Sequence, residues 1–260
     1  MTNDKKTLLV IGSQKNYIKL WRIRRMGIKR VMDVSVEEFR NMIEEGLDSA
    51  KLIIMKGIVE TSDFLRTIIK LNKKLGGSWL TQCSVVNPVP RYFWQKAKKP
   101  YILTDPAVVP YPDFEQYKIM TRNAILLARQ LNLSDKPVVN FLTPSSKIDP
   151  NIEFTLTVKE LEEWMAKEFP ELVVTHNAWD VCFSEHARKV KKIDAPRPDI
   201  VVCEIMNQAN SIYKALSVDA GYNIAGLLAG NPKMPVVSLN SRGDSIKDKL
   251  WAIRLGCRFK

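Results

Sequence analysis

Short apolar runs alternate with amphipathic stretches along most of the chain. Apolar runs predict buried strands at residues 7–12, 28–32, 50–55, 79–86, 100–103, 137–142, 172–175, 199–203 and 235–239. Apolar residues three and four apart predict helices at 17–23, 35–46, 62–74, from 113 to 131, at 157–169, 183–190 and 210–218, and from 246 onward. This alternation is typical of an α/β fold built around parallel strands.

Two short motifs predict where helices begin. Ser35 is followed three residues later by Glu38, and Thr157 is followed at the same distance by Glu160. In a capping box of this form, each side chain accepts a hydrogen bond from the other residue's backbone N–H. The sequence therefore predicts helix N-termini at Ser35 and Thr157.

The change of pattern near residue 120 predicts a second domain. We place the first α/β domain at residues 1–119 plus 233–260 and the second at 120–232, so that the final segment completes the first domain.

The stretch from Pro235 to Gly256 combines a strand, a polar turn and a helix. Residues 240–245 read Asn-Ser-Arg-Gly-Asp-Ser. Backbone N–H groups of a helix that begins at the carboxyl end of a strand favour anions. Arg242 adds a planar cation suited to phosphate or carboxylate, and Asp244 and Asp248 add carboxylates nearby. The same residue types also suit an ordinary turn, so the motif indicates a site only with partner segments elsewhere.

The chain of 260 residues has a formal net charge of +12, which favours phosphorylated or acidic ligands. Basic residues gather at 22–30 and 188–192, where solvated helix faces are the plainer interpretation. No RNP, zinc-finger or helix-turn-helix signature supports nucleic-acid binding.

The remaining composition argues against a metal site and a membrane span. The four cysteines show no C-x-x-C spacing and the chain has only two histidines, His176 and His186, which we interpret as structural. Apolar runs are shorter than the ~18 residues of a transmembrane helix, and the first is too short for a signal peptide. We therefore expect reduced thiols in a cytoplasmic protein with no membrane partner.

Five segments occur in one order along the chain: MKGIVETSDFLR at 55–66, YILTDPAVVPYP at 101–112, RNAILLARQL at 122–131, NSIYKAL at 210–216 and MPVVSLNSRGDSIKDKLWAI at 234–253. Together they resemble the phosphate acetyl/butyryltransferase family, and most closely its phosphate butyryltransferase branch, over about residues 45–256. The resemblance implies two α/β/α sandwich domains with an interdomain cleft, as in isocitrate/isopropylmalate dehydrogenase-like proteins.

The resemblance also implies a reaction: an acyl-CoA and phosphate give coenzyme A and an acyl phosphate, reversibly. In the direction of CoA acylation, the thiol attacks the acyl phosphate directly, so no covalent enzyme intermediate is needed. Coenzyme A is then a substrate, with acyl phosphate or inorganic phosphate as the other ligand, and no cofactor is tightly bound. A homodimer or higher homo-oligomer is expected.

Site residues are implied by position within the matching motifs. Arg242 matches the arginine that binds phosphate and carbonyl oxygens, and Ser241 matches the neighbouring serine that positions the thiol. Asp248 stands where the acetyl branch has its general base, whereas Asp244 matches the aspartate of the butyryl branch; Asp248 is preferred. Residues matching the substrate- and CoA-binding segments are Lys56, Gly57, Thr61, Thr104, Asp105, Asn210 and Lys214.

Plainer interpretations stand beside several of these matches. Lys56 and Lys214 also fit as exposed lysines, Thr61 as a helix N-cap, and Asp105 as a turn residue before Pro106.

The chain departs from the family pattern in three places: Val109 replaces an asparagine, Ala209 replaces a glycine, and residues 175–180 read THNAWD. These departures leave the acyl group open. They also leave a weakly active or inactive protein that binds CoA or a phosphate ligand as the alternative. A third possibility, a decarboxylating dehydrogenase-like protein, is disfavoured because the sequence has no metal-binding cluster of carboxylates.

Overall fold

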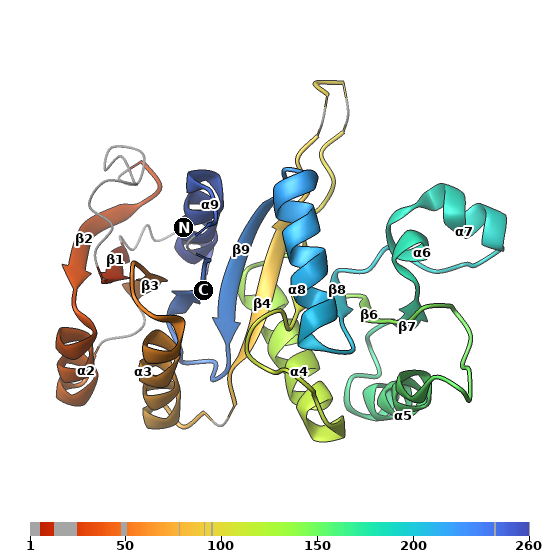
Figure 1. Ribbon diagram of the computed structural model, residues 1–260, viewed down its shortest axis with the longest axis horizontal. Coiled ribbons are helices and arrows are strands. Elements are labelled where there is room, and N and C mark those ends of the chain that lie inside the picture. The colour runs from red at the N-terminus through yellow and green to blue at the C-terminus, as the bar shows by residue number, and fades with distance from the viewer. Residues whose placement is uncertain are drawn as a thin grey trace. The chain divides into compact units, whose positions relative to one another are not determined.

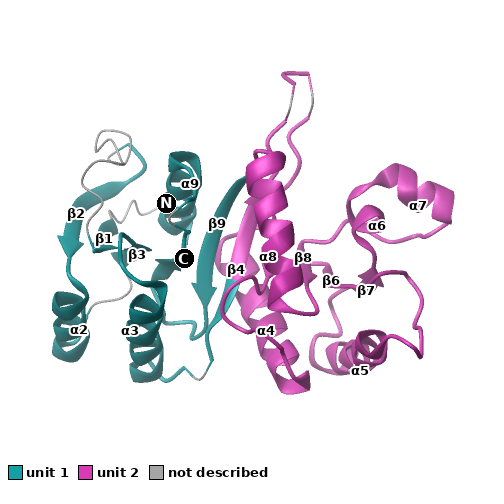
Figure 2. Cartoon of the chain, in the orientation of Figure 1, with its two compact units in different colours: residues 1–82, 223–260 teal, residues 83–222 magenta. Residues whose placement is uncertain are grey.

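The structure is a computed structural model that describes residues 6–12, 25–47, 51–77, 79–90, 92–94, 96–241 and 243–259. The chain divides into two compact units, residues 1–82 with 223–260 (unit 1) and residues 83–222 (unit 2) (Figure 2). Each unit combines a β-sheet with helices (Figure 1), which confirms the predicted α/β fold class. The helix predicted at residues 17–23 lies outside the described residues.

Unit 1 is organised around parallel strands. In spatial order these are β2 (Ile28–Val34), β1 (Lys6–Ile11), β3 (Leu52–Lys56), β10 (Val236–Ser238) and β9 (Asn223–Ala229). All pairings in this series are parallel except the antiparallel pair of β9 and β10. Because β10 comes from the end of the chain and pairs with β3, unit 1 is completed only by the C-terminal segment.

Three helices accompany this sheet: α2 (Val36–Glu45), α3 (Thr61–Lys74) and α9 (Ile246–Arg258). The capping box predicted at Ser35 is confirmed, because its hydroxyl accepts from the Glu38 N–H at 3.1 Å and the Glu38 carboxylate accepts from the Ser35 N–H at 2.6 Å. Helix α9 packs against β3 and β9, which are the two strands that flank β10.

The strands of unit 2 run in the spatial order β4 (Thr81–Asn87, of which the first two residues belong to unit 1), β5 (Tyr101–Thr104), β8 (Ile200–Val202), β6 (Val139–Leu142) and β7 (Val174–Asn177). Strands β4 and β5 are antiparallel, and the other pairings in the unit are parallel.

The helices of unit 2 are α4 (Phe114–Gln130), α5 (Glu153–Glu168), α6 (Trp179–Phe183), α7 (Glu185–Lys191) and α8 (Met206–Lys214), and α8 continues as a π-helical turn, η2 (Ala215–Asp219). Helix α4 packs against β5, β8 and α5, and α8 packs against β5. None of the helices among the described residues is long and apolar enough to cross a membrane.

Two details of the predicted helices are wrong. Helix α5 begins at Glu153, with Ile152 as N-cap, and the hydroxyl of Thr157 donates to the Glu153 carbonyl at 3.3 Å inside the helix. The buried face of α5 already starts at Phe154, so packing extends the helix beyond the local capping signal. The helix predicted at 183–190 corresponds to α7, and the short helix α6 before it was not predicted. The two helices meet at Ser184, whose hydroxyl accepts from the Ala187 N–H at 3.2 Å and caps α7.

The two compact units meet in the sequence at 82/83 and 222/223, whereas the predicted domains meet at 119/120 and 232/233. The difference follows from strand pairing: β5 pairs with β8 in unit 2, and β9 pairs with β10 in unit 1. The assignment of functional domains stays a prediction.

Candidate functional site

Two of the predicted segments lie side by side in unit 1. Strands β3 and β10 are parallel neighbours with Met55 opposite Ser238, so their carboxyl ends lie at the same edge of the sheet. Lys56 ends β3 with a buried side chain, and Ser241 is exposed just beyond the end of β10. The structure therefore brings the Lys56–Gly57 segment next to the Asn-Ser-Arg-Gly-Asp-Ser turn, as expected for a strand-end site in an α/β sheet.

Gly57 is required by the close approach of two chain segments at this edge. Its N–H donates to the Ile11 carbonyl at 2.8 Å, and a Cβ at position 57 would lie 2.5 Å from the same oxygen. A further contact of such a Cβ would be the Gly12 carbonyl oxygen, at 2.9 Å. Because both obstacles are backbone atoms, only glycine fits between the ends of β1 and β3.

The turn after β10 is held from both of its ends by Asp244. One carboxylate oxygen of Asp244 accepts from the Ser241 N–H at 2.7 Å, and the Asp244 N–H donates to the Ser241 carbonyl at 3.1 Å. The Asp244 side chain is buried, whereas Ser241 is exposed. Arg242, the predicted catalytic arginine, lies outside the described residues, but Ser241 before it and Asp244 after it are joined by this pair of hydrogen bonds.

Asp248 is almost fully buried at 2% exposure and lies in the first turn of α9. Its Oδ2 accepts from the Ser245 N–H at 2.9 Å and from the Ser245 hydroxyl at 2.6 Å. Its Oδ1 accepts from the Ile224 N–H at 2.7 Å. Asp248 and Ser245 thus form a capping box that the sequence analysis missed, although the Ser-x-x-Asp spacing signals it.

Asn240 is a second residue of this edge that the sequence analysis did not single out. Its side-chain carbonyl oxygen accepts from the Ser238 hydroxyl. Its Nδ2 is buried without a hydrogen-bond partner among the residues that the structure describes. Leaving a buried polar group unpaired costs about 1–3 kcal/mol, so such an atom beside an exposed turn indicates a binding function.

In unit 2, Thr104 is the last residue of β5 and Asp105 follows it, and both are buried. Oδ1 of Asp105 accepts from the N–H groups of Ala107 and Val108, each at 2.8 Å, which is the turn geometry considered as its plainer interpretation. The hydroxyl of Thr104 is buried and, within the described part of the chain, has no hydrogen-bond partner.

Helix α8 joins the loop after β5 through Asn210, whose Nδ2 donates to the Pro106 carbonyl at 3.0 Å. Lys214 lies one turn further along α8, with its Nζ 4.8 Å from the centre of the Tyr213 ring. The structure therefore brings Thr104, Asp105 and Asn210 together within unit 2. Thr61 is the exposed first residue of α3 and not its N-cap, because Glu60 holds the N-cap position.

The departures from the family pattern at Val109 and Ala209 are core positions. Val109 is 5% exposed and Ala209 is fully buried. An asparagine side chain at position 109 would need polar partners that an apolar core does not supply. Both departures therefore change side chains that pack in the core beneath the loops, and they leave the exposed binding groups unchanged.

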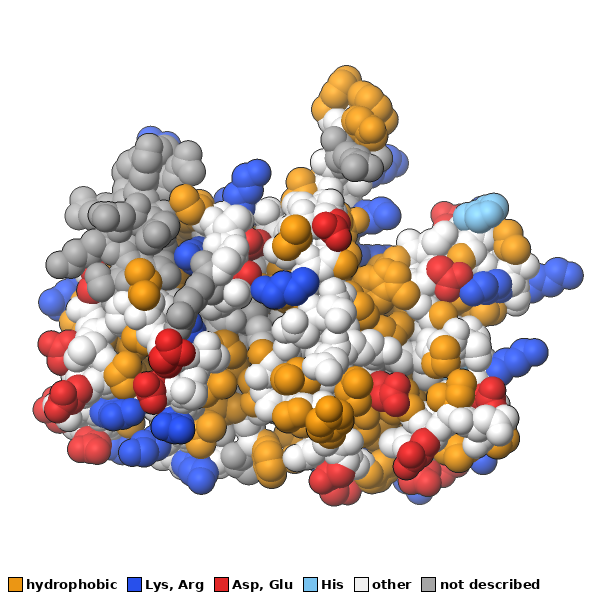
Figure 3. All heavy atoms as spheres, in the orientation of Figure 1, with side chains coloured by type: hydrophobic (Ala, Val, Ile, Leu, Met, Phe, Trp, Pro, Cys, Tyr) orange, Lys and Arg blue, Asp and Glu red, His pale blue; other side chains and the backbone are white. Residues whose placement is uncertain are grey.

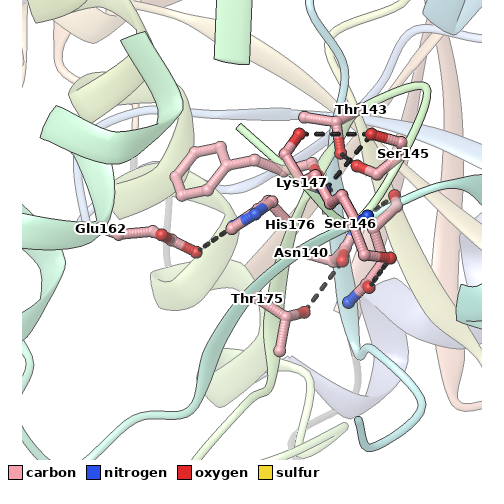
Figure 4. A network of polar contacts seen from close by, with 10 residues as sticks. Asn140, Thr143, Ser145, Ser146, Lys147, Glu162, Thr175 and His176 are labelled. Atoms are coloured by element: carbon pink, nitrogen blue, oxygen red, sulfur yellow. Dashed lines mark hydrogen bonds and ion pairs between the residues drawn. The ribbon is translucent and has the colours of Figure 1, made fainter. Parts of the chain in front are cut away.

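The third departure, residues 175–180, belongs to a polar network at the ends of β6 and β7 (Figure 4). The Ser146 hydroxyl donates to Oδ1 of Asn177 at 2.6 Å, and the Thr175 hydroxyl donates to Oδ1 of the fully buried Asn140 at 2.8 Å. His176 lies 2.7 Å from the Glu162 carboxylate, and this hydrogen bond raises the pKa of His176. The network anchors the loop after β6, so His176 has the structural role expected for it.

The described residues contain no group of three or more side chains that could hold a metal ion. Burial raises the pKa of the Cys182 thiol to about 12, and burial together with the charge of Asp105 raises the pKa of the Cys203 thiol further above its usual range. These thiols stay protonated at neutral pH, so they are poor nucleophiles.

The fold and the strand-end segments define an α/β protein of the phosphotransacylase and isocitrate dehydrogenase-like class. The chain superposes on a branched-chain phosphotransacylase from Enterococcus faecalis V583 with a TM-score of 0.79, at 20% identity over 97% of this chain and 98% of that one. It superposes on isocitrate dehydrogenase from Methylococcus capsulatus with a TM-score of 0.50, at 14% identity over 90% of this chain and 76% of that one.

The chain belongs to the phosphate acetyl/butyryltransferase family, because the family model described as "Phosphate acetyl/butaryl transferase" matches residues 42–256. It is 27% identical to a phosphate acetyltransferase of Thermotoga maritima over 239 residues, which cover 88% of this chain and 78% of the relative. It is also 27% identical to a phosphate butyryltransferase of Clostridium beijerinckii, over 86% of this chain and 75% of the relative. These relatives are phosphate acyltransferases, which are enzymes, so the predicted family and acyltransferase class are confirmed and the inactive alternative is not favoured.

Proposed function

We propose that this protein transfers a short acyl group between coenzyme A and phosphate, so that acyl-CoA and phosphate give coenzyme A and acyl phosphate. The observation that carries the proposal is the meeting of Lys56 and the Ser241–Asp244 turn at the carboxyl edge of β3 and β10. The N-terminus of α9 begins directly after this turn, so backbone N–H groups and a lysine gather where a phosphate would bind.

Arg242 is the residue to which we assign the largest share of catalysis. As the thiolate attacks the acyl carbon, negative charge develops on the carbonyl oxygen and on the leaving phosphate. A guanidinium group donates to two oxygens at once and keeps its charge at any physiological pH, so it suits both tasks. Ser241, the exposed neighbour, positions the thiol.

A base must take the thiol proton, and we assign this role to Asp248, with Asp244 as the alternative. Asp248 holds the first turn of α9 through three accepted hydrogen bonds, so the same carboxylate also positions the turn that carries Arg242. Asp244 has a corresponding role inside the turn through the Ser241 N–H. The two assignments predict different results. Substitution of the residue that acts as the base lowers activity by more than its loss of stability explains, and substitution of the other residue does not.

For binding of CoA and the acyl phosphate we assign Lys56, Gly57 and Thr61 in unit 1 and Thr104, Asp105, Asn210 and Lys214 in unit 2. Support for the strand-end positions comes from the unpaired buried atoms Nδ2 of Asn240 and Oγ1 of Thr104, among the described residues. A substrate oxygen that accepts from such a donor removes a cost of about 1–3 kcal/mol. Asn240 therefore joins the proposed binding residues.

We further propose that the enzyme acts in the cytoplasm as a homodimer or higher homo-oligomer and without a tightly bound cofactor. Four free cysteines, three of them buried, suit a reducing compartment. Direct thiol attack uses only the two substrates and the side chains named above, so the reaction needs no further group.

The test is an assay of thiol release from acetyl-CoA, propionyl-CoA and butyryl-CoA with and without inorganic phosphate. We expect phosphate-dependent release that falls by at least about 100-fold in Arg242→Ala, the loss typical for removing one donor to a developing oxyanion. Arg254→Ala is the matched control, because it removes the same charge from an exposed position on α9. If the wild type releases no thiol while CoA raises its melting temperature, the protein binds CoA without turnover and the proposal is wrong.

A further inference from the structure

Residues 88–90, 92–94 and 96–100 lie between β4 and β5 and project from the body of unit 2, where they are drawn in yellow in Figure 1. The end of this loop carries Tyr92, Phe93 and Trp94, which are 49%, 96% and 66% exposed, and we call these three residues the aromatic tip. Figure 3 shows hydrophobic side chains gathered at the end of this projection. Contiguous exposed aromatic surface of this kind marks an interaction site.

The aromatic tip is organised before any partner binds. The rings of Tyr92 and Trp94 stack with centroids 4.7 Å apart and planes 2° apart. Phe93 contacts Trp94 edge to face, with centroids 4.8 Å apart. Because aromatic side chains have few rotamers and these already pack on one another, docking them costs little conformational entropy.

A groove of about 1050 Å³ lies at the base of the same loop. The groove is lined by both arms of the loop, at Pro88–Pro90 and Lys96–Lys98, and by Ala215, Leu216 and residues 219–222 of η2 and the following turn. Leu216 and Val89 give it an apolar lining, and Asp219 gives it an acidic group. The groove and the aromatic tip are therefore adjacent parts of one surface.

We propose that the aromatic tip of one copy of this chain docks in the groove of a second copy, and that the second copy returns the same contact. In an isologous dimer each patch meets the corresponding patch of the partner, so a projection beside a groove of its own is self-complementary. The inference goes beyond the proposed reaction: it names the surface that forms the expected homodimer and does not depend on the chemistry.

The area of this surface is sufficient for a stable dimer. Each aromatic side chain contributes about 150–250 Å² when fully buried. The exposed fractions of the three rings then give about 300–500 Å² on each tip. Two tips and the two groove walls that they cover amount to about 1200–2000 Å², the size of a standard specific interface.

The groove favours a second copy over a lipid surface. Lys96 and Lys98 follow the aromatic tip, are exposed, and line the groove together with Asp219. A membrane would take the rings and the lysines but would leave the groove without an occupant.

The test measures association of the full-length protein by sedimentation velocity between about 0.1 and 100 μM. We expect the double substitution Phe93→Ser, Trp94→Ser to raise the dimer dissociation constant at least about 30-fold, as for the loss of one interface hot spot. Ala220→Arg, which places a bulky charge in the groove, is expected to have a similar effect. Val190→Ser, an exposed apolar position on α7, is the matched control and should dimerise like the wild type.

Mixing the tip variant with the groove variant makes the test specific. A mixed dimer keeps one intact tip in one intact groove, so we expect it to form more tightly than either variant alone. A wild type that stays monomeric at 100 μM would overturn the proposal, as would a tip variant or a mixture that associates no differently from its controls. A monomer that binds phosphatidylserine vesicles, and loses this binding in the tip variant, would overturn it in favour of a membrane. Thiol release is measured separately, so failure of the dimer leaves the proposed reaction untouched.

Discussion

The carboxylate of Asp248 accepts a hydrogen bond from the backbone N–H of Ile224 at 2.7 Å, which joins the first turn of α9 to the start of β9. The same carboxylate caps α9 through Ser245. One side chain therefore fixes the helix that follows the Ser241–Asp244 turn against the strand that pairs with β10. Substitution of Asp248 therefore affects both proton transfer and the position of α9. For this reason its effects on activity and on stability must be measured together.

Asp248→Asn is expected to lower the free energy of unfolding by about 1–3 kcal/mol, because the amide that replaces one oxygen cannot accept from its former donors. It should also lower kcat at least about 100-fold if Asp248 takes the thiol proton. Urea unfolding and the thiol-release assay measure the two effects.

Ser245→Ala is the control for Asp248→Asn, since it removes only the capping hydroxyl, at a cost of about 1 kcal/mol. The two variants are compared by their loss of activity relative to their loss of stability. If this ratio is the same for Asp248→Asn and Ser245→Ala, Asp248 only positions the turn. In that case Asp244→Asn should lower kcat at least about 100-fold instead.

Gly57→Ala is expected to destabilise the protein by about 1–3 kcal/mol, the usual cost of overpacking, since the new Cβ meets backbone oxygens at 2.5 and 2.9 Å. Gly243→Ala is the comparison: the nearest atom to its Cβ would be the Ser241 hydroxyl oxygen, at 4.0 Å. Chemical unfolding of both variants checks the prediction, and equal stabilities would contradict the close approach of β1 and β3.

Thr104→Val is expected to keep or slightly raise stability, because it removes a buried hydroxyl that has no partner among the described residues. It should nevertheless lower kcat/KM by about tenfold, as expected for the loss of one substrate hydrogen bond. Thr121→Val is the matched control: this equally buried hydroxyl donates to the Tyr117 carbonyl at 2.8 Å, so its loss should reduce stability and leave kcat/KM unchanged. Unchanged kcat/KM in Thr104→Val would remove Thr104 from the binding residues.

The ion pair of His176 and Glu162 predicts a small dependence of stability on pH. The hydrogen bond to Glu162 raises the pKa of His176 in the folded protein, so the stabilisation is fully present below the unfolded value of 6.5. It is lost as pH rises through the raised pKa. Glu162→Gln should therefore destabilise the protein by about 0.5 kcal/mol near pH 6 and by less near pH 9. Thermal melts at the two pH values decide this; a difference that grows with pH would contradict the assignment.

Local signals in the sequence determined much of the fold. The capping box at Ser35 starts α2 as predicted, whereas packing from Phe154 onward extends α5 beyond the similar motif at Thr157. The alternation of apolar runs located nine of the ten strands among the described residues to within a few residues, but β9 was not predicted as a strand. It could not show that β9 and β10 are antiparallel or that β5 pairs with β8, because strand order depends on packing between distant segments.

The candidate site was predicted residue by residue but not as an arrangement. Motif matching selected Lys56 and Ser241, and only the pairing of β3 with β10 shows that their segments meet at one edge. The buried Asn240 amide was missed, since nothing in the local sequence shows that its Nδ2 lacks a partner. Conversely, the departures at Val109 and Ala209 belong to the core, which spacing alone could not reveal.

Unit 1 contains both the first 82 residues and the last 38, whereas unit 2 is one continuous segment between them. During synthesis on the ribosome, every residue of unit 2 is added to the chain before β10 and α9. The edge of β3 that pairs with β10 therefore stays unpaired until these later elements have been made. We expect a fragment of residues 1–230 to resist proteolysis in unit 2 and to remain sensitive near its start, an order of folding opposite to the order of the sequence.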